Sequence, residues 1–171
     1  MTSVYFFNLT EKTEYDKKLL PQNVRDHCKK PESIAAATEL LNMGVENLRY
    51  EENGKPIADN YFVSISHSGD MVAVCKSENP VGIDIEKIDD TRNFEKIANR
   101  YFHGKEKEFF NENPTADAFY DIWTKKEAYT KIDGNGVIEI QKGIDVLSIE
   151  NHQFQTEKVN GYMLTICERI K

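Results

Sequence analysis

The sequence has no long apolar segment and no basic leader at its start. Its apolar runs are short, as at residues 4–7 (VYFF), whereas a transmembrane helix needs roughly 20 consecutive apolar residues. The first residues carry no Lys or Arg, and Glu11, Glu14 and Asp16 follow closely, which is unlike a secretory signal. We therefore expect a cytoplasmic protein without a membrane partner.

Cysteines are few, and acidic residues outnumber basic ones. The three cysteines, Cys28, Cys75 and Cys167, are scattered and show no C-x-x-C spacing, so neither a zinc ribbon nor a disulfide scaffold is expected. With 22 basic and 29 acidic residues the formal charge is −7, whereas a nonspecific nucleic-acid binder would need a basic excess. We expect no nucleic-acid partner. The acidic balance fits a protein that gathers carboxylates around a divalent cation.

The rest of the composition is that of a folded chain. Its 171 residues, 39% of them hydrophobic, suit one domain or two small lobes that share a core. Periodicity and turn residues predict an α+β pattern that runs twice, and the strands between residues 48 and 85 are expected to form an antiparallel meander. The predicted strands are residues 4–9, 48–51, 61–65, 71–75, 81–85, 137–140, 144–149, 152–156 and 162–167, and the predicted helices are 10–20, 31–43, 94–102, 105–110 and 114–131.

The predicted strand at residues 81–86 (VGIDIE) carries two carboxylates on one face. Side chains alternate between the faces of a strand, so Asp84 and Glu86 lie together, about 7 Å apart, opposite the apolar Val81, Ile83 and Ile85. Adjacent carboxylates repel each other unless a cation lies between them, and Mg²⁺ binds such oxygen ligands. From the strand alone, an ordinary solvent-exposed face explains the pair as well.

The last predicted helix carries a second group of charges. Trp123, Glu127 and Lys131 are four residues apart and form one stripe on a helix, with Lys126 beside it. One interpretation is a surface Glu–Lys pair next to a half-buried Trp. The other is a third carboxylate beside a lysine that meets phosphate.

Two predicted turns carry polar groups that can contact phosphate. Residues 66–69 (SHSG) combine hydroxyls, an imidazole and free turn amides between two predicted strands. Residues 53–56 (NGKP) have an ordinary turn signature whose lysine could contact a ligand. Plain turns without a ligand are the alternative for both segments.

Taken together and in order, four segments resemble the 4′-phosphopantetheinyl transferase superfamily. They are residues 54–56 (GKP), 64–68 (SISHS), 81–86 (VGIDIE) and 123–131 (WTKKEAYTK). The superfamily signature is G-[IV]-D-[IV]-E, followed roughly forty residues later by [FW]-x-x-K-E-[SA]-x-x-K, and both halves match without a gap. Because the first half lies behind a whole lobe, the chain resembles the larger Sfp type rather than the small trimeric holo-synthase type.

This resemblance implies a fold and a reaction. The fold would be two similar small α/β lobes, residues 1–86 and 87–171, in a pseudo-twofold arrangement, with the active site at their interface and a shortened C-terminal part. The chain would act as a monomer. It would transfer the 4′-phosphopantetheine arm of coenzyme A to a serine of an apo acyl or peptidyl carrier protein and release adenosine 3′,5′-bisphosphate. Mg²⁺ would be the cofactor, and oxygen ligands would accept Mn²⁺ as well.

The resemblance also implies which residues do the chemistry. Asp84, Glu86 and Glu127 would hold the metal ion, and Glu127 would take the proton of the acceptor serine. Lys131, together with Lys126, would stabilise charge on the pyrophosphate of coenzyme A.

Other residues would bind the remainder of coenzyme A. Ser66 and His67 would contact phosphate, and Lys55 and Pro56 would line the adenine side, next to Gly54.

One departure from the family pattern concerns the 3′-phosphate of coenzyme A. Sfp-type enzymes often carry a basic residue at the start of the first-lobe helix, whereas Glu32 lies close to that position here. Arg25, Lys29 and Lys30 are candidates to replace it.

Two other functions stay open from the sequence. A non-catalytic relative that binds coenzyme A or a carrier is favoured by Glu32 and by the short C-terminal part. Another Mg²⁺-dependent phosphotransfer or phosphohydrolase enzyme is allowed by the carboxylates alone. Three retained carboxylates and a lysine favour the transferase.

Overall fold

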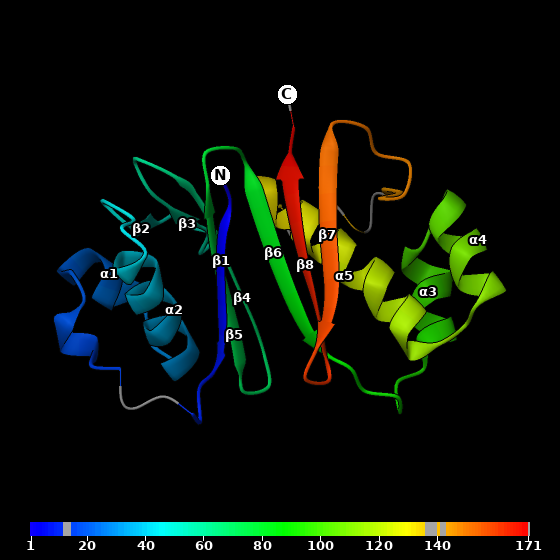
Figure 1. Cartoon of the computed structure of the whole chain (residues 1–171), viewed down its shortest axis with the longest axis horizontal. Coiled ribbons are helices and arrows are strands. Elements are labelled where there is room, and N and C mark those ends of the chain that lie inside the picture. Colours follow the sequence, from blue (N-terminus) through cyan, green and yellow to red (C-terminus); the bar gives the residue numbers. More distant parts are fainter. Residues whose placement is uncertain (12–14, 136–139, 141–142, 171) are drawn as a thin grey trace.

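The computed structural model describes all residues except 12–14, 136–139, 141–142 and 171, and its framework is a pair of three-stranded antiparallel sheets (Figure 1). The first sheet has the strand order β1-β5-β4, with β1 at Ser3–Asn8, β4 at Phe62–Ser68 and β5 at Met71–Ser77. The second has the order β6-β8-β7, with β6 at Val81–Lys87, β7 at His152–Val159 and β8 at Tyr162–Arg169. A short pair, β2 at Arg49–Tyr50 and β3 at Pro56–Ile57, precedes β4.

The helices pack on these sheets in two groups. In Figure 1, α1 and α2 lie at one end of the molecule, α3 and α4 lie at the other, and α5 runs diagonally behind the second sheet. Helix α2 contacts β5 and β4, whereas α5 contacts β6 and β8. The bounds are η1 (a 3₁₀ helix) at Lys17–Leu19, α1 at Gln22–His27, α2 at Pro31–Asn42, α3 at Phe94–Tyr101, α4 at Gly104–Glu112 and α5 at Ala116–Asp133.

Local sequence explains where α2 and α5 begin and end. Pro31 occupies the first turn of α2, where its missing N–H needs no partner, and Gly44 follows the helix at φ +80°. The Thr115 side chain accepts a hydrogen bond from the Ala118 N–H and so caps the start of α5. Gly134, at φ +75°, ends α5 in the left-handed conformation that glycine adopts without strain. Both predicted helices are therefore confirmed with small changes at their ends.

The two sheets share an apolar core. Ala73 and Cys75 of β5 belong to the same buried cluster as Ile83 and Ile85 of β6 and Leu164 of β8. Separate clusters lie between the first sheet and α2 and among the aromatic side chains of α3 to α5. The halves of the chain are therefore fixed against each other by buried apolar surface, which is the main stabilising contribution to a fold.

The structure confirms the mixed α+β class and corrects three details. Strand β6 pairs with β8 instead of continuing the meander from β5. The described part of residues 10–20 forms a turn and the short η1 instead of a long helix, and residues 144–149 form turns instead of a strand. Most of the predicted strand at 137–140 lies outside the described residues. Within the part of the chain that the structure describes, no helix is long and apolar enough to span a membrane.

Candidate active site

Strand β6 presents two carboxylates on the face opposite its buried apolar side chains. Val81, Ile83 and Ile85 are buried in the core between the sheets, as the strand alternation predicts. On the other face, Asp84 has only 5% of its side chain exposed, and Glu86 is half-buried. The apolar face thus anchors the strand, and the acidic face is free to form a site.

Gly82 allows helix α5 to approach this acidic face closely. A Cβ atom at Gly82 would lie 1.9 Å from the carbonyl oxygen of Ala128 and 3.3 Å from the backbone nitrogen of Ile132. No side chain fits in that space, so glycine is required by the packing. Because Gly82 and Asp84 share a strand face, the same close approach brings α5 to the carboxylates.

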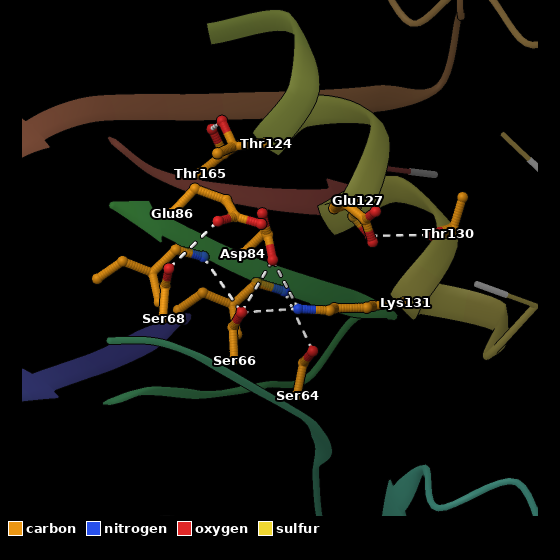
Figure 2. A network of polar contacts seen from close by, with 12 residues as sticks. Ser64, Ser66, Ser68, Asp84, Glu86, Thr124, Glu127, Thr130, Lys131 and Thr165 are labelled. Carbon is orange, nitrogen blue, oxygen red and sulfur yellow. Dashed lines mark hydrogen bonds and ion pairs between the residues drawn. The ribbon is translucent and has the colours of Figure 1, made fainter. Parts of the chain in front are cut away.

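Helix α5 supplies a lysine and a third carboxylate. The Lys131 Nζ atom lies 2.7 Å from Asp84 Oδ1 and 2.8 Å from Ser66 Oγ, and 27% of the lysine side chain is exposed (Figure 2). Glu127 lies one helical turn before Lys131, on the same side of α5. The structure therefore brings together Asp84, Glu86, Glu127 and Lys131, from the two halves of the sequence signature.

Three serines at alternate positions of β4 connect the first sheet to β6. Their hydroxyl oxygens accept hydrogen bonds from backbone N–H groups of β6, and from one contact to the next the residue number rises by two on both strands. Figure 2 shows the contacts of Ser64 and Ser66. The pairs are Ser64 with Ile83 at 3.1 Å, Ser66 with Ile85 at 3.2 Å and Ser68 with Lys87 at 3.0 Å. Strands β4 and β6 thus run parallel at the junction of the sheets, and serine side chains take the place of a backbone ladder. We call these three residues the serine ladder.

Two members of the serine ladder also donate to the carboxylates. Ser66 Oγ donates to Asp84 Oδ1 at 2.8 Å, and Ser68 Oγ donates to Glu86 Oε2 at 3.2 Å. The sequence predicted Ser66 as a phosphate contact, and its contact with Asp84 was not foreseen. The role of Ser68 was also missed, although the S-x-S-x-S alternation before D-x-E is a signal that could have indicated it.

Burial and crowding of the carboxylates change their acid–base behaviour. Burial, followed by the charge of Asp84, raises the pKa of Glu127 to about 7, and the nearby Lys131 opposes this shift. Burial and Asp84 also raise the pKa of Glu86, while the hydrogen bond from Ser68 lowers it. Asp84 Oδ2 is buried and has no hydrogen-bond partner. The group therefore holds more negative charge than Lys131 neutralises.

As the side chains stand, the cation that contacts Asp84 is the ammonium of Lys131. Among the described residues, no three or more His, Cys, Asp or Glu side chains are arranged to hold a metal ion. The donor set still suits a hard divalent cation, because it consists of carboxylate oxygens and includes a buried oxygen that lacks a partner.

Two of the predicted coenzyme A residues lie beside this group. Lys55 and Pro56 line a cavity of about 200 Å³ together with Lys131 and Ser64. The Lys55 ammonium donates to the carbonyl oxygen of Ile132 at 2.6 Å, near the end of α5. The turn at residues 53–56 and the end of α5, which are far apart in the sequence, therefore meet at one cavity.

Three further predicted residues are exposed and lie away from the carboxylates. His67 lies between Ser66 and Ser68 on β4, so its side chain points to the opposite face of that strand. Lys29 and Lys30 directly precede α2, which packs on β5 and β4.

Lys126 is not part of this site. Its side chain is 1% exposed, and its Nζ atom lies 2.8 Å from both carboxylate oxygens of Glu106, on α4. The predicted contact with pyrophosphate does not fit this position, because consecutive helix residues point in directions about 100° apart. Lys131, one turn after Glu127, occupies the position at the carboxylates instead.

The chain belongs to the 4′-phosphopantetheinyl transferase superfamily, whose family model matches residues 80–169. It is 37% identical over 105 residues to the 4′-phosphopantetheinyl transferase gsp of Aneurinibacillus migulanus, which covers 58% of this chain and 44% of that protein. It is 34% identical over 110 residues to the 4′-phosphopantetheinyl transferase Sfp of Bacillus subtilis, covering 60% and 46%. The resemblance seen in the sequence, including the Sfp type, is confirmed. The chain spans about half the length of the curated relatives it matches.

Proposed function

We propose that the chain transfers the 4′-phosphopantetheine arm of coenzyme A to a serine of an apo acyl or peptidyl carrier protein and releases adenosine 3′,5′-bisphosphate. The observation that carries this proposal is the meeting of Asp84, Glu86, Glu127 and Lys131 at the β6–α5 contact. All four lie within the residues that the superfamily model matches. Related proteins of the superfamily carry the name of this activity.

In this proposal Asp84, Glu86 and Glu127 hold a Mg²⁺ ion. The unpartnered Asp84 Oδ2 supports a cation here, and so do the pKa values of Glu86 and Glu127, which are raised first by burial and then by the charge of Asp84. When bound, Mg²⁺ would neutralise negative charge on the pyrophosphate of coenzyme A. Mn²⁺, which also accepts oxygen ligands, is an equally suitable ion for this donor set.

The protein side chains would divide the remaining work. Glu127 accepts the proton of the carrier serine, because its carboxylate lies at the group that would hold the metal ion and the reacting phosphate. Lys131 donates hydrogen bonds to pyrophosphate oxygens as charge develops on them. Its partial exposure leaves the ammonium accessible to such a ligand.

Coenzyme A would extend from this group towards the cavity beside Lys55 and Pro56, which takes the adenine side. Ser66 would contact phosphate on the side of β4 that faces the carboxylates. His67, on the opposite face of that strand, would contact phosphate away from them, and Lys29 and Lys30 would meet the 3′-phosphate. The shared cavity of Lys55, Pro56 and Lys131 supports this path.

We further propose that the chain is a cytoplasmic monomer of two lobes, residues 1–86 and 87–171, related by a pseudo-twofold axis with the site at their interface. The support is that each three-stranded sheet packs against a long helix, α2 on the first and α5 on the second. Because β6 hydrogen-bonds to β8 of the second sheet, a boundary drawn between the two sheets would fall before Val81, at the start of β6, and not after residue 86.

An intact-mass assay with coenzyme A, Mg²⁺ and a panel of apo carrier proteins tests the activity. We expect one carrier to gain a single phosphopantetheine group, and we expect no gain in chelator or with Asp84→Asn. Asp121→Asn, on the same helix as Glu127, is the control that should retain transfer. Coenzyme A binding without transfer to any carrier would favour the non-catalytic relative, and turnover without a carrier would favour a phosphohydrolase. Absence of coenzyme A binding would overturn the proposal.

A further inference from the structure

A buried ion pair that the proposed reaction does not use lies between α5 and α4. Lys126 is 1% exposed and Glu106 is 0% exposed, and the ammonium lies 2.8 Å from each carboxylate oxygen. Glu106 also accepts the backbone N–H groups of His103 at 3.0 Å and Val146 at 2.7 Å. Lys126 donates in addition to the carbonyl oxygen of Ile144.

Every hydrogen-bonding atom of this pair has a partner, as the burial of two charges requires. Removal of one partner from such a pair leaves an uncompensated buried charge, so the arrangement is strongly maintained once formed. It joins three segments, because Glu106 lies on α4, Lys126 on α5, and residues 144–146 follow α5 in the chain. The last segment is also held to α4 by Asp145, whose side chain accepts the Lys105 N–H at 2.8 Å.

The position of the pair relative to Glu127 gives it a consequence for the site. Lys126 and Glu127 are consecutive and point about 100° apart around the helix axis. Any rotation of α5 that moves Glu127 away from β6 must therefore also withdraw Lys126 from Glu106. We propose that Lys126 and Glu106 are positioning residues, which fix the rotation of α5 and so aim Glu127 at Asp84 and Glu86; this rests on the proposed function of Glu127.

The test compares two double variants on one helix. Lys126→Met/Glu106→Gln removes both buried charges and keeps an acceptor oxygen for one of the two backbone N–H groups. The control, Lys125→Met/Asp121→Asn, removes the neighbouring ion pair of α5, whose atoms lie 2.7 Å apart and which is partly exposed. We expect kcat to fall about 10- to 100-fold in the first variant, with the KM for coenzyme A changed less than about threefold, because small misplacement of a catalytic group affects turnover before binding. The kcat of the control should stay within about twofold of the wild-type value.

A crystal structure of the first variant provides a readout that needs no turnover. We expect the Glu127 carboxylate to lie about 1 Å or more from its wild-type position relative to Asp84. A folded variant with an unmoved Glu127 and kcat within about twofold of the wild type would overturn the proposal. Should that variant fail to fold, Lys126→Arg, which keeps the charge but enlarges the buried group, is judged by the same two readouts. Failure of the wild type to modify any carrier would overturn the proposed function alone, since the displacement of Glu127 is measured separately.

Discussion

Ser66 Oγ, on β4 of the first sheet, lies 2.8 Å from Asp84 Oδ1, on β6 of the second sheet. The same oxygen accepts the Ile85 N–H at 3.2 Å and a hydrogen bond from Lys131 at 2.8 Å. One hydroxyl thus joins the two sheets, the strand that carries Asp84 and the helix that carries Lys131. The orientation of Asp84 therefore depends on the junction of the sheets and not on β6 alone.

The serine ladder provides a matched pair of variants that separates stability from activity. Ser64→Ala and Ser66→Ala each leave a backbone N–H of β6 without its acceptor, so each should lower the free energy of unfolding by about 1–3 kcal/mol. Only Ser66→Ala also removes the contacts with Asp84 and Lys131. We expect kcat at saturating coenzyme A to fall more than about 10-fold in Ser66→Ala and less than about threefold in Ser64→Ala. Urea unfolding and the carrier assay measure both quantities, and equal kcat values would contradict the role given to Ser66.

Gly82 should tolerate no side chain, because α5 rests against it. Gly82→Ala places a Cβ atom 1.9 Å from the Ala128 carbonyl oxygen, so α5 must move away from β6. We expect a loss of about 3 kcal/mol or more in the free energy of unfolding, at the upper end for overpacked sites. Gly54→Ala is the control, since its Cβ meets nothing within 4 Å and only its φ of +85° is unfavourable. That control should lose about 1–2 kcal/mol, and an equal loss in both variants would argue against the steric explanation.

Features set by neighbouring residues could be predicted from the sequence. The alternation along β6 separated Ile83 and Ile85 from Asp84 and Glu86, and the structure confirms both faces. The ends of the long helices also follow local rules, as Gly134 shows for α5. The sequence signature then predicted that the stripe with Glu127 and Lys131 would meet the strand, as the structure finds.

Features that depend on distant segments could not be predicted from the same patterns. The partner of β6 is β8, about 80 residues later, and no local signal distinguishes it from the nearer β5. The side of α5 that Lys126 faces depends on Glu106, which lies on another helix. Residues 144–149 have strand-like apolar spacing, but Asp145 accepts N–H groups of Lys105 and Leu147 and so favours a turn.

The raised pKa of Glu127 makes the stability of the metal-free protein depend on pH. The unfolded carboxyl titrates at its ordinary value and the folded one at about 7, so the folded state binds more protons between these pH values. Stability should therefore fall as the pH rises from 5 to 7.5. Glu127→Gln removes this penalty and should be more stable than the wild type by about 1–3 kcal/mol at pH 7.5, with little difference at pH 4.5. Urea unfolding in chelator at both pH values measures the effect.

A control variant and one contrary outcome make the pH experiment decisive. Glu108→Gln is a control that removes an exposed carboxylate of α4, and it should leave the pH dependence unchanged. A wild-type free energy of unfolding that rises between pH 5 and 7.5, with no gain from Glu127→Gln, would show that Glu127 is ionised throughout this range.

Divalent cation binding should stabilise the protein, since it neutralises crowded carboxylates. A cation at 100 times its Kd adds about 2.7 kcal/mol to the free energy of unfolding. For a chain of this size, we expect Mg²⁺ to raise Tm by about 5–10 °C relative to chelator at pH 7.5. The increase should be lost in Asp84→Asn and kept in Asp121→Asn. An equal increase in both variants would place the cation elsewhere.

The exposed lysines before α2 allow a test of the proposed contact with the 3′-phosphate of coenzyme A. Lys29→Glu/Lys30→Glu reverses two charges without disturbing buried groups, because both side chains are exposed. If these lysines meet the 3′-phosphate, the variant should bind coenzyme A at least about 10-fold more weakly, since charge-assisted contacts to phosphate are among the stronger hydrogen bonds. Binding of dephospho-coenzyme A, which lacks that group, should change less than about threefold. Isothermal titration calorimetry with both ligands gives the two ratios.

The control reverses two lysines at the other end of the molecule, Lys105→Glu/Lys107→Glu on α4 (Figure 1). It changes the net charge by the same amount, so long-range repulsion of an anionic ligand affects both variants alike. A larger loss for coenzyme A in the α2 variant than in the α4 variant, absent for dephospho-coenzyme A, would identify a direct contact. Equal losses for both ligands would show that Lys29 and Lys30 act only through net charge and that another group binds the 3′-phosphate.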